Sequence, residues 1–111
     1  MNFKKLQGEI VIKEGEASKR SIINSQSGQL TLTDKRLVFV GDGTNFGEAS
    51  VVINTEDIMI FSKVSTSLII FPIPVPNAFK IVTKQGKKYK FTVTGVKKWI
   101  AELNNVINSS N

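Results

Sequence analysis

Short runs rich in Val, Ile, Phe and Thr recur along this chain, and turn-forming residues separate them. The spacing of roughly ten residues between turns is typical of an all-β sandwich or barrel. No internal repeat or low-complexity tract interrupts the pattern. The predicted strands span residues 9–13, 17–24, 28–33, 36–41, 50–54, 57–63, 67–72, 78–83 and 87–93.

The alternating leucines of the first hairpin predict how its two strands pair. Leu30 and Leu32 must face the same side as Phe39 and Leu37, because a shift of one residue would move one set to the opposite face. This condition pairs Leu32 with Leu37 and Leu30 with Phe39. The turn then consists of residues 33–36.

The last hairpin is registered by its aromatic residues. Phe79 and Ile81 share a face with Phe91 and Tyr89 if Ile81 lies opposite Tyr89. The loop is then residues 84–86, which end in a glycine that can take a positive φ. A two-residue loop would place Ile81 opposite a lysine, so we exclude it.

After the last strand the apolar period changes to that of a helix. The apolar stripe consists of Val96, Trp99, Ile100, Leu103, Val106 and Ile107. Thr94 is the expected N-cap, and residues 108–111 are expected to form a disordered tail. We expect the Trp99 face to dock on the sheets rather than on a membrane surface, because a small sandwich needs this closure.

Composition excludes most catalytic chemistry. The 111 residues form one domain, spanning residues 1–111 with a core of about 9–107, and they include neither Cys nor His. Disulfides, thiolate or imidazole metal sites and the usual general base are therefore excluded. We predict no enzymatic activity, no catalytic residue, no metal and no cofactor.

Three patterns that resemble catalytic or phosphate sites are rejected. The glycine-rich residues 41–47 lead into a strand, so no helix N-terminus could receive a phosphate. Glu56 and Asp57 are neighbours on a predicted strand and would face opposite sides. Ser18–Lys19 and Ser62–Lys63 are rejected as catalytic serine–lysine dyads because neighbouring residues on a strand also face opposite sides.

The net charge of +6 comes entirely from the C-terminal third of the chain. Residues 1–78 carry eight charges of each sign, whereas residues 79–111 carry seven lysines and one acid, Glu102. This asymmetry predicts a positive face for an anionic partner, although lysines that only solvate exposed strands would give the same pattern. The candidate anion- or lipid-binding residues are Lys80, Lys84, Lys87, Lys88, Lys90, Lys97 and Lys98.

A proline at every second position marks residues 71–76. These prolines remove amide donors from one edge of an extended chain, which favours an edge strand protected from aggregation. A proline-rich ligand for an SH3-like partner is a second interpretation. In a third, Phe71, Ile73 and Val75 form an apolar surface for a membrane or another subunit.

The sequence GQLTLTDKRLVF at residues 28–39 resembles the signature of the GRAM family, a branch of the pleckstrin-homology-like superfold. The terminal hairpin and the helical Trp99 follow in the order typical of that family. The resemblance covers about residues 9–107 and suggests a small stand-alone member of bacterial type. It implies a mostly β sandwich or partly open barrel of about seven strands, capped by one C-terminal α-helix.

Family membership implies binding to membranes, phosphoinositides or proteins. Pleckstrin-homology domains that bind inositol phosphates resemble one another in a lysine followed by Lys/Arg-x-Arg across the first hairpin. This chain has Lys13 and then the adjacent Lys19 and Arg20, which would face opposite sides of a strand, so a specific phosphoinositide pocket is disfavoured. We predict attachment to an anionic membrane surface or an acidic protein through the lysine-rich face. Nucleic acid is disfavoured because the aromatic residues are buried and arginines are few.

The alternative function is association with a protein, or with a second copy as a homo-oligomer, through residues 68–76. The longest uncharged apolar run is too short to span a membrane. We therefore expect a cytoplasmic protein, with peripheral attachment to the inner face of the membrane as one option.

Overall fold

The computed structural model describes residues 6–20, 25–43, 50–66 and 75–109. These residues form seven strands, a short 3₁₀ helix and one α-helix. The elements are β1 (Val11–Arg20), β2 (Ser25–Thr33), β3 (Arg36–Gly41), β4 (Val51–Asn54), η1 (Thr55–Asp57), β5 (Ile58–Thr66), β6 (Val75–Thr83), β7 (Lys88–Val93) and α1 (Val96–Ser109).

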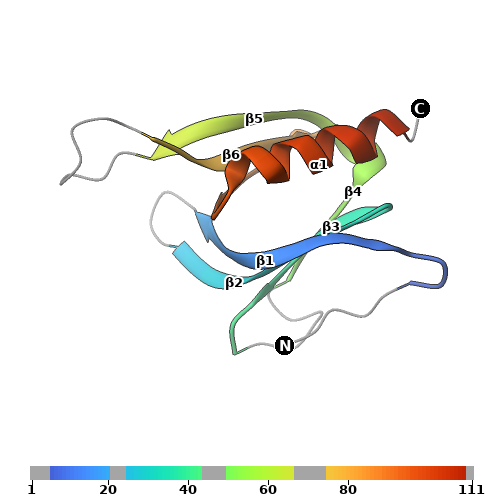
Figure 1. The fold of residues 1–111 in the computed structure, drawn as a ribbon, viewed down its shortest axis with the longest axis horizontal. Coiled ribbons are helices and arrows are strands. Elements are labelled where there is room, and N and C mark those ends of the chain that lie inside the picture. Colours follow the sequence, from blue (N-terminus) through green and yellow to red (C-terminus); the bar gives the residue numbers. More distant parts are fainter. Residues whose placement is uncertain (1–5, 21–24, 44–49, 67–74, 110–111) are drawn as a thin grey trace.

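The strands are antiparallel and follow the order β4-β3-β2-β1-β7-β6-β5. The long strand β1 pairs with β2 along its length and with β7 at its C-terminal end, so it belongs to both halves of the sheet. Figure 1 shows the two halves as layers, with α1 lying along the layer of β5 and β6. The expected architecture, a nearly closed sandwich of seven strands with a C-terminal helix, is confirmed for the described residues.

Both predicted hairpin registers are confirmed. Leu32 pairs with Leu37 and Leu30 with Phe39 across β2 and β3. Across β6 and β7, Ile81 pairs with Tyr89. The loop between them is the expected one, because the Thr83 amide donates to the Lys87 carbonyl and Gly86 has a φ of 86°.

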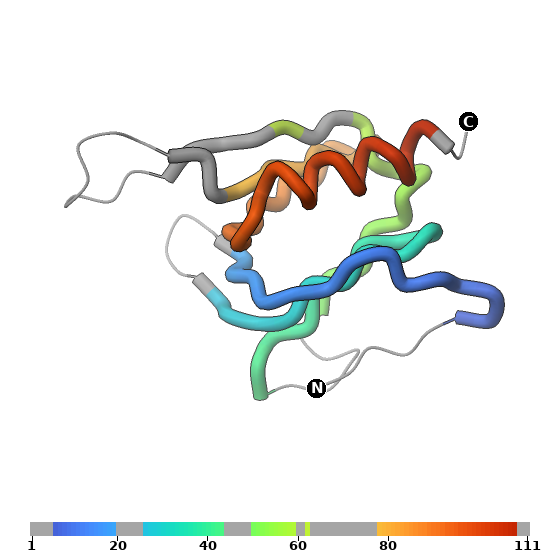
Figure 2. Tube along the Cα trace, in the orientation of Figure 1, coloured from blue at the N-terminus to red at the C-terminus, as the bar shows by residue number. Residues whose placement is uncertain are grey.

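The core between the layers is organised around aromatic rings. Phe91 lies 5.7 Å from both Phe39 and Phe79, measured between ring centroids, and Phe79 lies 6.2 Å from Trp99. Trp99 is 2% exposed, so the predicted docking face of α1 is confirmed. The tube in Figure 2 shows how this helix closes the space beside the sheet layers.

The N-terminal part of the fold differs from the expectation. Residues 9–13 and 17–24 were predicted as two strands, but Val11–Arg20 is a single strand. Gly15, which lies between the two predicted ranges, pairs with Leu30 within β1. A Cβ atom at Gly15 would make an ordinary van der Waals contact of 3.7 Å with the Trp99 ring. The predicted strand 67–72 lies outside the described residues.

Three smaller expectations are wrong. Glu56 and Asp57 lie in η1 rather than on a strand, because the chain turns there between β4 and β5. The first helical carbonyl acceptor is that of Gly95, whose φ is 71°, so Thr94 is not the N-cap. The helix continues through Ser109, two residues into the expected tail, because the side-chain amide of Asn108 donates to Asn104.

Candidate anion-binding surface

The β6–β7 hairpin carries the central pair of predicted lysines. Lys80 lies directly opposite Lys90, as the alternation of core residues requires. Their neighbours Ile81 and Phe91 are fully buried, whereas Lys80 and Lys90 are half-buried. The core therefore fixes the two lysine backbones side by side.

This pairing is electrostatically unfavourable without a counter-ion. Like charges directly opposite each other in an antiparallel pair destabilise it. On its other side Lys80 pairs with Ser62 of β5, which is uncharged. Neither cross-strand partner of Lys80 is therefore acidic. An anion bound beside Lys80 and Lys90 would relieve their repulsion.

The register of β1 adds one more residue on the far side of Lys90. Arg20 pairs with Lys90 across β1 and β7. Residues 62, 80, 90 and 20 thus form one row across four strands. Sequence interpretation did not assign Arg20 to this surface, since no local signal reveals which strand will pair with β1.

Lys19 is separated from this row. Its ammonium nitrogen lies 6.0 Å from the centroid of the Phe39 ring, which is part of the core. Phe91, which also belongs to the core, is the register partner of Lys19 in β7.

Lysines at the tip of the hairpin lie in a different environment. Lys84 and Lys87 are exposed, and so is Lys88, but Lys88 is the first residue of β7 and its pairing with Val82 places it on the same face as Lys80 and Lys90. The Lys84 amide donates to the Asp57 carbonyl at 2.8 Å, and Lys87 shares a pocket of about 130 Å³ with Asp57. The tip is therefore positioned by η1 and has a carboxylate near it.

The helical lysines Lys97 and Lys98 are exposed and form a third group. Lys98 lines a pocket of about 220 Å³ between α1 and β1, together with Lys13 and Glu102. Lys13 places its ammonium nitrogen 5.3 Å from the centroid of the Trp99 ring, at a distance suited to a cation–π interaction. The seven predicted lysines thus occupy three settings around the fold: the β6–β7 strands, the hairpin tip and the helix.

The predicted apolar surface is described only at its end. Phe71 and Ile73 lie outside the described residues. Val75 is the first residue of β6 and pairs with Thr66 of β5, and the next residue, Pro76, pairs with Ser65. The β6–β7 register begins further on, at Ala78.

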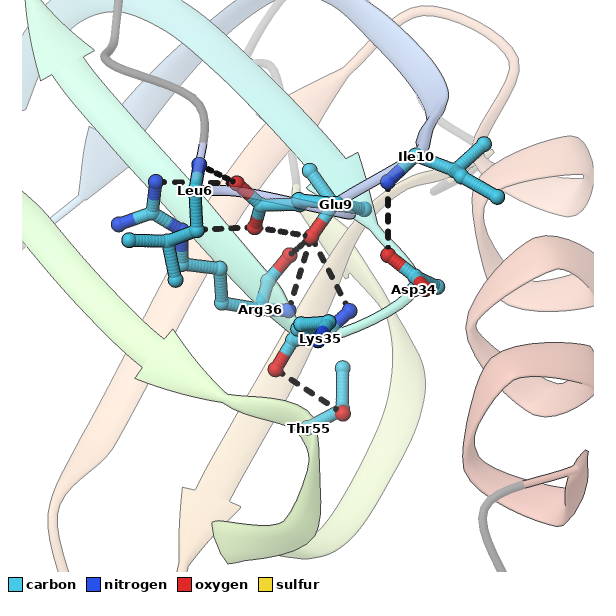
Figure 3. Close-up of polar contacts among 8 residues, drawn as sticks. Leu6, Glu9, Ile10, Asp34, Lys35, Arg36 and Thr55 are labelled. Carbon is cyan, nitrogen blue, oxygen red and sulfur yellow. Dashed lines mark hydrogen bonds and ion pairs between the residues drawn. The ribbon is translucent and has the colours of Figure 1, made fainter.

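A buried ion pair ties the segment before β1 to the β2–β3 hairpin, and sequence interpretation missed it. Glu9 is 2% exposed and accepts hydrogen bonds from Arg36 Nε at 2.8 Å, Arg36 Nη2 at 3.1 Å and Thr33 Oγ1 at 2.6 Å. Figure 3 shows the Glu9 carboxylate between the Leu6 amide and the Arg36 guanidinium. The contact joins residues 27 positions apart, which no local pattern indicates.

These bonds control the ionisation of Glu9. Burial by itself would raise its pKa, but the hydrogen bonds from Arg36, Thr33 and the Leu6 amide, together with the Arg36 charge, outweigh burial. The pKa falls from an ordinary value of 4.5 to about 2. The carboxylate is therefore ionised at neutral pH and fully engaged, which is the behaviour of a structural contact.

Two further observations concern membranes and metals. Among the described residues, no helix has the length and apolar character needed to cross a membrane. In the same residues, no group of three or more carboxylate, imidazole or thiol side chains is arranged to hold a metal ion.

Comparison with solved structures identifies the fold. The N-terminal PH domain of Vps36 superposes with a TM-score of 0.72 at 13% sequence identity, covering 96% of this chain and 84% of its own. This chain has the pleckstrin-homology fold. No family model matches the sequence, and no curated protein matches it either.

Other pleckstrin-homology structures are also similar. The linker-DH/PH structure of p115-RhoGEF has a TM-score of 0.72 at 16% identity, with 94% of this chain and 30% of that chain covered. The Slm1 PH domain, solved in complex with phosphoserine, has a TM-score of 0.58 at 16% identity and coverage of 86% and 91%. Likeness at this level of identity establishes the pleckstrin-homology fold alone.

Proposed function

We propose that this protein is a non-catalytic binding module of the GRAM branch. It attaches to an anionic membrane surface through the β6–β7 lysine row, which we define as Lys80 and Lys90 with Arg20 beside them. The exposed lysines 84, 87, 88, 97 and 98 add long-range attraction to the same surface. An acidic protein is the alternative anionic partner.

The observation that carries this proposal is the direct pairing of Lys80 with Lys90. Half-buried lysines that face each other repel more strongly than freely solvated ones, because they have less room to separate. A surface that only needed solubility could have alternated lysine with glutamate. Bound anionic groups would neutralise the repulsion between Lys80 and Lys90 and so stabilise the pair.

The comparisons are compatible with this proposal. The Slm1 PH domain was solved in complex with phosphoserine, a ligand that carries a phosphate. The expected location is cytoplasmic, at the inner face of the membrane, where anionic lipids attract basic surfaces.

The test is co-sedimentation with vesicles of phosphatidylcholine, with and without phosphatidylserine. The parent should bind the anionic vesicles at low salt and dissociate as ionic strength rises. Lys80→Glu with Lys90→Glu should abolish most of this binding. The matched control is Lys97→Glu with Lys98→Glu, which makes the same change in net charge on the helix and should retain most of it.

Three outcomes would contradict the proposal. Equal losses in the two double variants would mean that net charge matters and the row does not. Unchanged binding in Lys80→Glu with Lys90→Glu would mean that the row is only solvated. Salt-independent association, detected as dimers or as vesicle binding, would favour the alternative module that uses residues 68–76.

A further inference from the structure

A groove of about 130 Å³ follows the free edge of β4. β4 is a terminal strand of the sheet, and among the described strands it pairs with β3 alone. Val52, Ile53 and Asn54 all line the groove. Because consecutive residues of a strand point to opposite faces, a groove that touches all three runs along the edge of the strand.

The register shows which backbone groups of β4 face this groove. The Thr55 amide donates to the Lys35 carbonyl at 3.0 Å, and these two residues continue the β3–β4 register. In an antiparallel pair, residues that exchange hydrogen bonds alternate with residues that do not. Ile53 is therefore bonded to β3, whereas the amides of Val52 and Asn54 and the Val52 carbonyl point to the free edge. Val52 is 47% exposed, so this edge is open to a partner.

The sequence of β4 does not protect its edge. Lysine, proline and bulges commonly prevent an edge strand from pairing with another chain. The four residues of β4 are Val, Val, Ile and Asn, and their pairing with β3 is regular. The other terminal strand, β5, has register irregularities at two places. Of the two edges, that of β4 is therefore the better template for an added strand.

We propose that the β4 edge binds an extended segment of an acidic partner protein as an additional antiparallel strand. One residue of the segment exchanges two backbone hydrogen bonds with Val52, and Asn54 donates to the carbonyl two residues earlier. The side chain between them points to the Ile53 face, where Tyr89 also lines the groove. The small volume of the groove suits a single extended chain rather than a folded surface.

Charge selects the acidic segment over a second copy of this chain. Lys87 and Asp57 are the charged residues of the described lining, and they offset each other. The net charge of +6 therefore decides, because it attracts an acidic segment and makes two copies repel. Tyr89 packs against the core, whereas its neighbour Lys90 faces the opposite side of β7. The site is thus distinct from the proposed lysine row and goes beyond membrane attachment.

The test is amide hydrogen exchange, followed by NMR, with the peptide acetyl-Glu-Val-Thr-Val-Glu-amide. In the free protein the amides of Val52 and Asn54 should exchange fast and that of Ile53 slowly. The peptide should slow exchange at Val52 and Asn54. The matched ligand has the same side chains with every central amide N-methylated, and it should have no effect because it lacks the donors.

Variants locate the binding. Val52→Pro should abolish it, because proline removes an amide that β3 does not use, whereas Val52→Thr should retain it. Lys87→Gln should weaken binding by about threefold. Lys98→Gln makes the same change in net charge on α1 and should leave peptide affinity unchanged. If Val52→Pro does not fold, the methylated peptide tests the same hydrogen bonds.

The proposal is overturned if the peptide does not bind, if the methylated peptide binds equally well, or if Val52 and Asn54 are already protected in the free protein. Protection that grows with protein concentration would identify a second copy as the occupant and overturn it. Equal affinity for a peptide with lysine in place of glutamate would overturn the choice of an acidic partner. None of these outcomes depends on vesicle binding.

Discussion

At the residue scale, Gly28 is required by the close approach of β2 to β3. A Cβ atom at this position would lie 2.3 Å from the Val40 carbonyl oxygen and 2.7 Å from the Phe39 ring. Both neighbours belong to the fixed core or backbone, so they cannot move aside cheaply.

We therefore expect Gly28→Ala to lower the free energy of unfolding by about 2 kcal/mol or more, measured by urea denaturation. Gly15→Ala is the control, since its Cβ would make an ordinary contact of 3.7 Å with Trp99. Its effect should stay below about 1 kcal/mol. Equal losses in the two variants would show that the close approach at Gly28 is not the cause.

Glu9 makes stability depend on acid pH. Its pKa is lower in the folded protein than in the unfolded chain, so its stabilising effect is fully present above about pH 4.5. This effect is lost as the pH falls from 4.5 towards the folded pKa of about 2. The shift corresponds to a contribution of the order of 3 kcal/mol.

The measurement compares the parent with Glu9→Gln by urea denaturation between pH 7 and pH 2. The difference in unfolding free energy should be largest and constant above pH 5, and should shrink below it. Other carboxyl groups titrate in both proteins, so the difference isolates Glu9. If the difference in unfolding free energy between the two proteins does not change with pH, the ionised carboxylate does not stabilise the fold.

At the scale of elements, α1 is held to the sheets by Trp99. The indole ring is 2% exposed and contacts the aromatic core through Phe79. Truncation of a buried tryptophan removes apolar contacts and leaves a cavity. We expect Trp99→Ala to cost about 3–5 kcal/mol and to lower the melting temperature markedly. A variant that melts with the parent would show that α1 is not essential for closure of the sandwich.

The two hairpins and the helix could be predicted because each is a local problem. Leu30 and Leu32, or Ile81 and Tyr89, leave one register in which all apolar side chains share a face. The stripe of α1 likewise lies within one continuous segment. Such elements depend on residues that are close in sequence, and alternation is sufficient to define them.

Long-range pairing could not be predicted in this way. Arg20 is paired with Lys90 by the strand register, and Glu9 forms an ion pair with Arg36. Nothing in the local sequence indicates either contact. The same is true of Ser18, Ser27 and Thr92, which pair across three strands. The pairing of Lys80 with Lys90 could therefore be predicted from sequence, whereas the position of Arg20 opposite Lys90 could not.

At the scale of the whole molecule, the charge is distributed unevenly. The lysines of β6, β7 and α1 carry the excess of positive charge, and they lie in three settings around the fold. Long-range attraction to an anionic surface then depends on ionic strength, because salt screens exposed charges.

We expect the logarithm of membrane affinity to fall with the logarithm of salt concentration. The slope should be shallower in Lys80→Glu with Lys90→Glu than in the parent. Each lysine close to an anionic membrane contributes about 1 kcal/mol, so reversing two should remove several kcal/mol at low salt. Vesicle titrations at a series of salt concentrations give both quantities. Parallel slopes for the two proteins would mean that these lysines are remote from the membrane.

The strand β1 also determines how this chain must reach its folded state. The β2–β3 and β6–β7 hairpins close through short turns, but the β1–β7 ladder joins Ala17 to Val93, from opposite ends of the sequence. Closing so long a loop is slow, and neither layer is complete until it has happened. We expect the ladder to form late and to limit the folding rate. Loss of the same ladder would open both layers together, so the domain should unfold in one cooperative step.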